Sequence, residues 1–178
     1  MSTGKIQVYY GAGRGKTSAA LGYAIHEASK GESVIVIQFL KRKDEDEISF
    51  LGRLEPEIRL FRFQKSEKYY NELPDEGQLE EQMNMKNGIN YARKVLQTGE
   101  CNILILDEVL SVGDAKFRKK SEKKVLSMFD KGVTVLFVSH SLQQVQRLCN
   151  KAMILEKGRL IAYGDIDEIS EQYEKMIE

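Results

Sequence analysis

Residues 9–18 read YYGAGRGKTS, a glycine-rich stretch between two segments with different hydrophobic periods. Apolar residues alternate in residues 6–10, as in a β-strand, whereas those in residues 21–28 recur at helical spacing. The stretch therefore connects the carboxyl end of a strand to the amino end of a helix. Backbone N–H groups and the helix dipole at such a junction attract an anion, and glycine allows a close backbone approach. The sequence thus predicts a cradle for phosphate groups.

The stretch can be compared with the P-loop pattern G-x-x-x-x-G-K-[ST]. Lys16 is expected to reach the terminal phosphates of a nucleotide, and Thr17 to offer its hydroxyl to Mg²⁺. The pattern requires a glycine where the chain has Tyr10, so the first glycine comes one residue late, at Gly11. A glycine-rich turn with an incidental Lys-Thr pair is the alternative. The residues expected to bind the nucleotide are Gly11, Gly13, Arg14, Gly15, Lys16, Thr17 and Ser18.

A second group of polar residues ends the apolar segment 102–108, NILILDE. A buried strand there delivers Asp107 and Glu108 to its carboxyl end, which is the Walker B arrangement. We expect Asp107 to hold Mg²⁺, directly or through water, and Glu108 to polarise an attacking water. An Asp-Glu pair at a strand end is by itself common as a helix cap. Together with Lys16 and Thr17, it predicts complementary halves of one Mg-nucleotide site.

A further candidate follows the apolar segment 133–138, VTVLFV, which is typical of another buried strand. Ser139 and His140 come directly after it, and residues at strand ends of α/β sheets meet ligands. His140 is therefore a candidate sensor of the γ-phosphate, with a structural or exposed histidine as the alternative. His26 lies within the first helical segment and is assigned no role.

The composition indicates one α/β domain, because 178 residues suffice for a substantial core but not for two ordinary domains. Lysine plus arginine equals aspartate plus glutamate at 27 each, so no net charge attracts nucleic acid or an acidic membrane. The apolar runs are strand-sized and no signal-peptide region is recognised, so we expect a cytoplasmic protein without membrane insertion. Cys101 and Cys149 lack metal-ligand spacing and are interpreted as buried thiols.

The remaining segments continue the alternation of strands and helices. The charged run 41–47 is interpreted as a surface connection, with a mobile loop near the ligand as the alternative. Met83 and Met85 are expected to fill the core. Strands are predicted at 33–40, 58–63, 152–155 and 160–163, the last two as a hairpin, and helices near 21–28, 85–96, 117–128, 142–149 and 166–176.

Residues 5–106 resemble the corrinoid adenosyltransferases of the cob(I)alamin or cob(I)yrinic acid a,c-diamide type. The resemblance rests on GKIQVYYGAGRGKTSAALGYAIHEASKG, on VIVIQFLK and on the P-loop that is one residue short. It implies that ATP binds in an orientation that exposes its ribose carbon to the cobalt nucleophile of a corrinoid. By this resemblance the phosphates are held by Gly13, Gly15, Lys16 and Thr17.

From about Leu110 the chain resembles the end of ABC transporter ATP-binding subunits of the polysaccharide and teichoic-acid exporter group. The matching stretches are LSVGDAKFRKKSEKKV and VTVLFVSHSLQQVQRLCNKAMILEKGRLIAYGDIDEI. This resemblance implies that Glu108 is the catalytic glutamate, residues 111–114 the D-loop and His140 the switch histidine. Residues 89–101, INYARKVLQTGEC, contain no LSGGQ-like signature, and the adenosyltransferase's own segment after Walker B is replaced.

Both families carry an LDE-type Walker B motif, so the two resemblances meet where the families agree. We interpret the chain as an engineered or recombined chimera of an adenosyltransferase part, about 1–108, and an ABC-ATPase part, about 107–178. By resemblance, both parents place the strand after Walker B between the P-loop strand and the Walker B strand. The expected fold is one P-loop NTPase domain over 1–178, a three-layer α-β-α sandwich with a mainly parallel sheet, a C-terminal hairpin and a final helix.

The expected function is binding of ATP, or another nucleoside triphosphate, with Mg²⁺ and at most slow hydrolysis. One alternative is retained ATP:corrinoid adenosyltransferase activity, with a corrinoid as second substrate. Another is an ABC-type ATPase that pairs with a second subunit, and a third is a fold whose cradle is empty or distorted. We expect a monomer or weak dimer that binds no nucleic acid.

Overall fold

The computed structural model describes residues 6–10, 15–39, 51–68, 70–109, 115–126, 133–139, 142–156 and 159–177. Within them, the strands are β1 Ile6–Tyr10, β2 Val34–Gln38, β3 Ile58–Arg62, β4 Ile103–Asp107, β5 Thr134–Ser139, β6 Lys151–Glu156 and β7 Arg159–Asp165. The helices are α1 Lys16–Ala28, α2 Asp75–Thr98, α3 Ala115–Leu126, α4 Leu142–Leu148 and α5 Ile166–Ile177, with 3-10 turns η2 Leu51–Leu54 and η3 Tyr70–Glu72. The charged run 41–47 lies outside the described residues.

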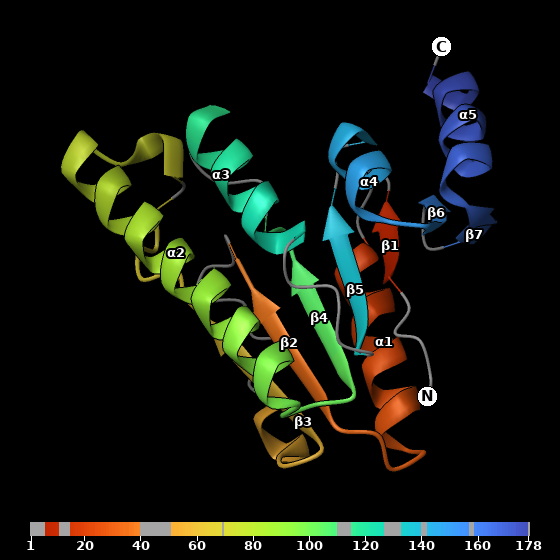
Figure 1. Ribbon diagram of the computed structural model, residues 1–178, viewed down its shortest axis with the longest axis horizontal. Coiled ribbons are helices and arrows are strands. Elements are labelled where there is room, and N and C mark those ends of the chain that lie inside the picture. Colours follow the sequence, from red (N-terminus) through yellow and green to blue (C-terminus); the bar gives the residue numbers. More distant parts are fainter. Residues whose placement is uncertain are drawn as a thin grey trace.

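The strands form one sheet in the order β3-β2-β4-β5-β1-β6-β7. β5 pairs in parallel with β1, where Tyr10 is opposite Ser139, and with β4, where Asp107 is opposite Val138. β1, the strand before the glycine-rich stretch, is therefore separated from β4 by one strand, as the resemblance implied. Because β1, β2, β4 and β5 are parallel, their carboxyl ends meet at one edge of the sheet (Figure 1).

Helices cover both faces of this sheet, which explains why its central strands are almost continuously apolar. Alternate strand residues contribute to two separate cores. Ile35 and Leu104 belong to the core under α2, whereas Val36 and Ile105 belong to the core that contains Ala20 and Ala24 of α1. Figure 1 shows α2 and α3 on one face and α1 on the other. The three-layer fold expected from the sequence is confirmed.

The expectation that Met83 fills the core is wrong, and one apolar residue of segment 21–28 is exposed as well. Ile25 of α1 is 47% exposed, because the face of α1 toward the sheet is centred on Ala20 and Ala24. Met85 of α2 is fully buried as expected, but Met83 is 67% exposed. Residues two positions apart point to nearly opposite sides of a helix, so Met83 and Met85 cannot both face the sheet.

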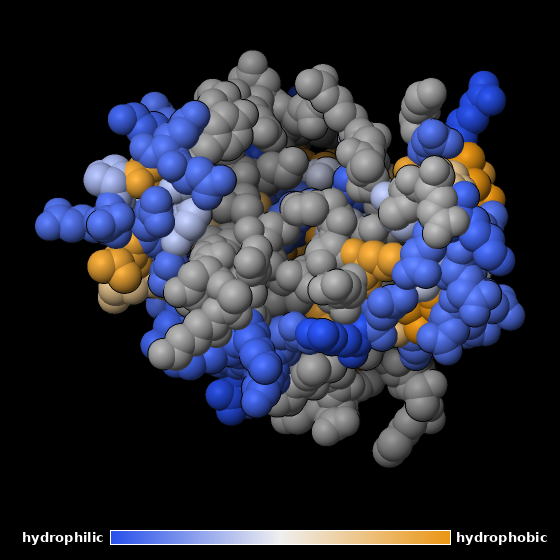
Figure 2. Space-filling view, turned by 90° about the horizontal axis from the view of Figure 1, so that it is seen from above, coloured by the Kyte–Doolittle hydropathy of each residue, from blue (hydrophilic) through white to orange (hydrophobic). Residues whose placement is uncertain are grey.

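Met83 instead lies on the outer side of α2. It lines a groove between α2 and α3 together with Leu79, Lys120 and Lys124. Figure 2 views the edge at which the parallel strands end, and hydrophobic side chains reach the surface on the side where Figure 1 places the start of α2. The exposed methionine is thus part of the surface around this groove and not of the core.

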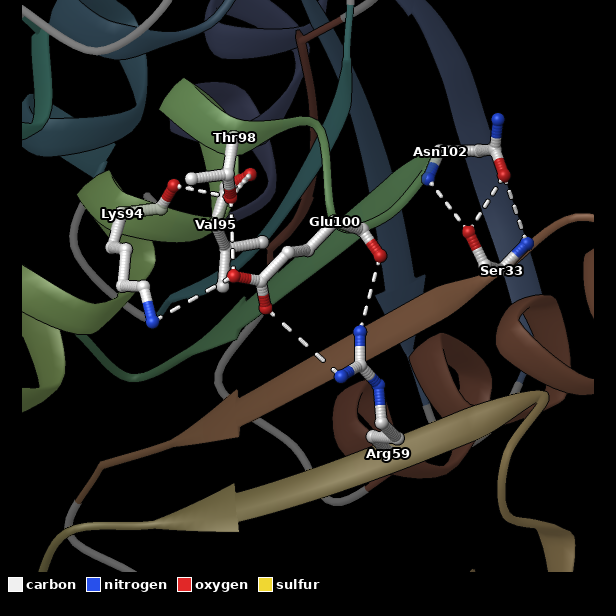
Figure 3. Close-up of polar contacts among 7 residues, drawn as sticks. All are labelled: Ser33, Arg59, Lys94, Val95, Thr98, Glu100 and Asn102. Atoms are coloured by element: carbon white, nitrogen blue, oxygen red, sulfur yellow. Dashed lines mark hydrogen bonds and ion pairs between the residues drawn. The ribbon is translucent and has the colours of Figure 1, made fainter.

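At the opposite edge of the sheet, polar contacts connect residues at the starts of β2, β3 and β4 (Figure 3). The backbone N–H and the hydroxyl of Ser33 donate to Oδ1 of Asn102 over 3.0 and 2.7 Å. Nη2 of Arg59 donates to the carbonyl of Glu100 over 3.1 Å, just beyond Gly99, which ends α2 with a φ of 66°. These contacts hold β2, β3 and β4 in register and thereby set which residues meet at the other edge.

The carboxyl-terminal part follows the expected order of hairpin and helix. β6 pairs in parallel with β1 and antiparallel with β7, and Nζ of Lys151 lies 2.7 Å from Oδ1 of Asp165 across the hairpin. Ile169 of α5 is buried against the same core as α2. The hairpin therefore extends the parallel sheet beyond β1 and gives α5 a surface on which to pack.

Both cysteines are buried and unbridged, as expected. Burial raises the pKa of the Cys101 thiol to about 11 and that of the Cys149 thiol to about 12. Among the residues that the structure describes, no group of three or more histidine, cysteine, aspartate or glutamate side chains is placed to hold a metal ion. No helix in this described part has the length and apolar character needed to span a membrane.

Candidate functional site

The amino end of α1 follows the glycine-rich stretch, and Gly15 is the residue at which the helix begins. Its φ of 112° and ψ of −15° lie in a region that residues with a Cβ rarely adopt. The carbonyl of Gly15 accepts the first helical hydrogen bond, from the N–H of Ala19 over 2.8 Å. Lys16, Thr17 and Ser18 therefore form the first turn of α1, where the helix dipole and its N–H groups favour an anion.

Thr17 contacts Asp107 at the end of β4. Its hydroxyl Oγ1 donates a hydrogen bond of 3.1 Å to Oδ2 of Asp107 and lies 3.4 Å from Oδ1. Thr17 is half-buried, and Asp107 is 1% exposed. The structure thus brings together the two residues that the sequence predicts as ligands of Mg²⁺.

Asp107 also contacts Gln38, and Gln38 in turn contacts Arg62; the sequence-based reasoning missed both residues. Gln38, fully buried at the end of β2, donates from Nε2 to Oδ2 of Asp107 over 3.1 Å. Nε of Arg62, at the end of β3, donates to Oε1 of Gln38 over 3.0 Å. Gln38 is opposite Asp107 in one strand pair and opposite Arg62 in the other, so the parallel register places these side chains in one row. The available signal was an amide within the otherwise apolar segment 34–40.

Glu108 turns the chain away from the sheet directly after Asp107. Its φ is +60°, which is uncommon for a residue other than glycine and is concentrated at functional sites. Its N–H donates to the carbonyl of Val138 over 2.9 Å, while the carbonyl of Asp107 accepts from the N–H of Phe39 over 2.9 Å. Glu108 is half-buried and directly follows the buried Asp107.

Four of the predicted site residues lie outside the described part of the chain, namely Gly11, Gly13, Arg14 and His140. Their assigned roles stay predictions. The nearest described residue to His140 is Ser139, which is buried at the end of β5 between β1 and β4. The other predicted residues are described. Gly15 to Ser18 lie at the start of α1, and Asp107 and Glu108 lie at the end of β4, which Thr17 contacts.

The oxygen atoms that Thr17 and Asp107 present at this edge are suitable ligands for a magnesium ion. Mg²⁺ prefers oxygen ligands, commonly one or two from protein together with phosphate oxygens and water. The hydroxyl of Thr17 and the carboxylate of Asp107 supply such oxygens within 3.1 Å of one another. The start of α1 beside them supplies N–H groups for phosphate. Chemically, the arrangement can hold a metal-bound phosphate chain.

Comparison with known families identifies two kinds of relative. Residues 2–139 match the model of the family described as ATP:corrinoid adenosyltransferase BtuR/CobO/CobP. The teichoic acids export ATP-binding protein TagH of Bacillus anthracis is 44% identical over 93 residues, 52% of this chain and 17% of that protein. The O-antigen export system ATP-binding protein RfbB of Klebsiella pneumoniae is 42% identical over 81 residues, 46% of this chain and 33% of that protein. The chain thus spans a third or less of these two relatives.

Solved structures with the same fold include a metal-chelate type ABC transporter in an inward-facing conformation. It aligns with a TM-score of 0.55 and 19% identity over 95% of this chain and 75% of that one. The KaiC-like protein PH0186 from Pyrococcus horikoshii OT3 aligns with a TM-score of 0.58 and 14% identity over 89% and 76%. These likenesses concern the fold alone, which is that of the P-loop NTPases.

The comparisons confirm both resemblances drawn from the sequence and show that the matches overlap. The family match leaves only Met1 and residues 140–178 outside it. A stretch of 93 or 81 residues cannot fit there, so each relative also aligns with part of residues 2–139. The chain has the fold of the P-loop NTPases and carries signals of both adenosyltransferases and ABC ATPases.

Proposed function

The chain belongs to the ATP:corrinoid adenosyltransferase family BtuR/CobO/CobP, and on this premise we propose that it binds ATP, or another nucleoside triphosphate, together with Mg²⁺. The binding site is the carboxyl edge of the sheet, where α1 begins beside the end of β4. The single observation that supports this most directly is the 3.1 Å hydrogen bond between Thr17 and Asp107. It joins the two halves of the expected Mg-nucleotide site.

Each residue has a separate task in this proposal. Backbone N–H groups at the start of α1 and the ammonium of Lys16 bind phosphate oxygens. The Thr17 hydroxyl and the Asp107 carboxylate hold Mg²⁺, which neutralises charge on the phosphates. Glu108 and His140 are the candidates for orienting an attacking water, and hydrolysis is at most slow.

We also propose that the chain is a chimera, engineered or recombined, with its join near residues 106–110. The support is 40 to 44% identity to export ATPases over stretches of 72 to 93 residues, within a chain of the adenosyltransferase family. Residues 89–98 are the last turns of α2 and have no LSGGQ-like signature. A plot of identity to each family along the chain should cross over near this join. Uniform similarity to one family on both sides would contradict the chimera.

Nucleotide binding is tested by titrating a fluorescent ATP analogue with the wild type and with Lys16→Ala. Loss of a charged hydrogen-bond donor should weaken binding by about tenfold or more. Lys30→Ala is the matched control, because Lys30 lies just beyond the other end of α1 and pairs with Glu27 over 2.8 Å. It should bind as the wild type does. Equal affinity of Lys16→Ala and the wild type would overturn the assignment.

Adenosyl transfer to a corrinoid is the second candidate function. The observation that favours it is that the family match continues through Asp107 and Glu108 to residue 139. Incubation with ATP and a chemically reduced corrinoid should then yield the adenosylated product. A yield no higher than that of Lys16→Ala would remove this candidate.

An ABC-type ATPase that pairs with another subunit is favoured only by the relatives of the export group. Such an enzyme closes its nucleotide site with a signature motif from the second subunit. If two copies of this chain cooperated in this way, the ATPase rate per chain should rise with protein concentration. A rate per chain that is independent of concentration would count against it.

A further inference from the structure

We propose that Gln38 is a positioning residue for the magnesium site, which it serves by holding the carboxylate of Asp107, and that Arg62 holds Gln38. The inference rests on the proposed binding of Mg-nucleotide. It assigns a role to two residues from strands that neither the glycine-rich stretch nor the Asp-Glu pair includes.

The first support is the geometry at Oδ2 of Asp107. This oxygen accepts hydrogen bonds from Nε2 of Gln38 and from Oγ1 of Thr17, each of 3.1 Å. Two donors that arrive from different elements, β2 and α1, fix the rotation of the carboxylate about its Cβ–Cγ bond. Asp107 is 1% exposed, so bulk water cannot supply these hydrogen bonds instead. The orientation of the carboxylate therefore depends on the protein, and Gln38 is one of the donors that set it.

The second support is that the Gln38 amide is itself held in one orientation. An amide has donors on its nitrogen only and acceptors on its oxygen only. Because Nε of Arg62 donates to Oε1 over 3.0 Å, Nε2 is the group that is turned toward Asp107. The amide is neutral, so it orients the carboxylate without cancelling the negative charge that attracts Mg²⁺. The row from Arg62 through Gln38 to Asp107 thus favours one acceptor geometry at the metal site.

The third support is the cost of placing an amide at this position. Residues 34–37 and Phe39 around Gln38 are all buried and apolar, and Gln38 is fully buried as well. Burying a polar group costs free energy unless the group is hydrogen-bonded. An apolar side chain at this position would avoid that cost, so the packing of β2 alone does not require an amide. The amide is explained by its contact with Asp107.

Gln64 provides a natural comparison within the same chain. It is also buried, at 6% exposure, but its Nε2 donates to the backbone carbonyls of Ser66 and Lys68 over 2.8 and 3.4 Å. Gln64 therefore supports a connection between β3 and α2. Replacing it tests what the loss of a buried amide does to the fold without changing a contact to Asp107.

The experiment compares the wild type with Gln38→Met, Arg62→Met and the control Gln64→Met. Methionine has nearly the length of glutamine but lacks its amide. A fluorescent ATP analogue is titrated first in EDTA and then at saturating protein over a range of Mg²⁺ concentrations. Binding of Mn²⁺ in the presence of nucleotide, followed by its EPR signal, gives a second readout that requires no turnover.

Gln38→Met should raise the Mg²⁺ concentration at half-maximal effect, and the Mn²⁺ dissociation constant, by about tenfold. The affinity for nucleotide in EDTA should stay within about twofold of the wild type, because no phosphate ligand is changed. Gln64→Met should keep the wild-type metal dependence even if its melting temperature falls. Metal affinities of Gln38→Met within about twofold of the wild type would overturn the inference.

If circular dichroism shows that Gln38→Met does not fold, the inference is tested with Arg62→Met instead. Its side chain lies nearer the edge of the sheet, and its loss frees the amide to rotate. A rise in the Mg²⁺ midpoint of about threefold or more would support the inference, and a wild-type midpoint would overturn it. A wild type that binds no nucleotide in EDTA or with Mg²⁺ would instead overturn the proposed function, and the inference with it.

Discussion

The hydroxyl of Thr17 lies 3.1 Å from Oδ2 of Asp107, although 90 positions separate the two residues in the sequence. The contact exists because α1 is the element that follows β1 in the chain and because a single strand, β5, separates β1 from β4. A side chain at the start of α1 therefore reaches across the end of β5 to β4. A second strand between β1 and β4 would move the two residues apart, because neighbouring strands lie about 4.8 Å from one another.

Removing the charge of Asp107 should abolish most of the effect of Mg²⁺ on nucleotide binding. In Asp107→Asn the metal loses an anionic ligand, so the Mg²⁺-dependent gain in affinity should fall by about tenfold or more, measured by titration of a fluorescent ATP analogue. Binding in EDTA should be unchanged or tighter, because a negative charge near the phosphates is gone. The control is Asp165→Asn, an exposed aspartate paired with Lys151. A full Mg²⁺ effect in Asp107→Asn would contradict the site.

Gly15→Ala should destabilise the protein, because its φ of 112° is strained for a residue with a Cβ. We expect the free energy of unfolding in urea to fall by about 1–3 kcal/mol. Gly22→Ala is the matched control in the same helix, since a Cβ at Gly22 meets no atom within 4 Å. That change should raise the free energy of unfolding by up to about 1 kcal/mol. Equal effects of the two substitutions would contradict the helix start described above.

Gly88→Ala should also destabilise the protein, but through packing. A Cβ at Gly88 would lie 2.6 Å from Cε1 of Phe39 and 2.9 Å from Cδ2 of Phe63, so α2 would have to move away from the sheet. We expect a loss of about 1–3 kcal/mol in urea unfolding, which outweighs the gain in helix propensity.

Gly77→Ala in the same helix is the control for Gly88→Ala. There the nearest atom to a new Cβ is a side-chain atom of Leu73 at 3.4 Å, which is ordinary contact. Gly77→Ala should therefore be neutral or stabilising. If Gly88→Ala were at least as stable as Gly77→Ala, the close approach of α2 to Phe39 and Phe63 would be wrong.

Alkaline pH should weaken the fold through its buried thiols. Burial raises the pKa of Cys101 to about 11 and that of Cys149 to about 12, so the folded chain keeps these protons where the unfolded chain loses them. Stability is therefore unaffected by the thiols below the unfolded pKa and falls above it. From about pH 9 to 10.5, each thiol should lower the free energy of unfolding by up to ~1.4 kcal/mol per pH unit.

The measurement is urea unfolding at several pH values for the wild type and for the double variant Cys101→Ala with Cys149→Ala. The variant should start from a lower stability, because two buried side chains are shortened, yet its decline with pH should be shallower. Native thiols should also react slowly with a thiol reagent until urea unfolds the chain. A parallel decline in both proteins would show that other groups cause the pH dependence.

Hydrophobic periodicity placed the central strands to within about two residues of their ends. β4 is correct because a strand buried on both faces is a short apolar run, which here ends at Asp107. β1 is correct because its apolar residues alternate up to the glycine-rich residues that follow it. Which side of a helix is buried was harder to predict. Ile25 and Met83 are apolar and exposed, whereas Ala24 and Met85 are buried against the sheet. Which of the apolar residues of a helix face the sheet depends on the surface against which the helix packs.

Some residues of the candidate site could be predicted from the sequence and others could not. The glycine-rich stretch and the Asp-Glu pair have patterns with a chemical meaning, so Lys16, Thr17, Asp107 and Glu108 were selected from the sequence. Gln38 and Arg62 belong to no such pattern. Their place in the site depends on the register of β2 with β4 and with β3, which is a long-range property.

The sequence by itself determined the local features of this protein. A glycine-rich turn before a helix, a Lys-Thr pair at the helix start and a buried strand that ends in Asp-Glu follow from neighbouring residues, since turn composition and burial periodicity are local. Only the tertiary structure decided that Thr17, Asp107, Gln38 and Arg62 form one connected row. The reason is that strand order and register place residues from α1, β4, β2 and β3 at the same edge, and hydrogen bonds of about 3 Å follow from that placement.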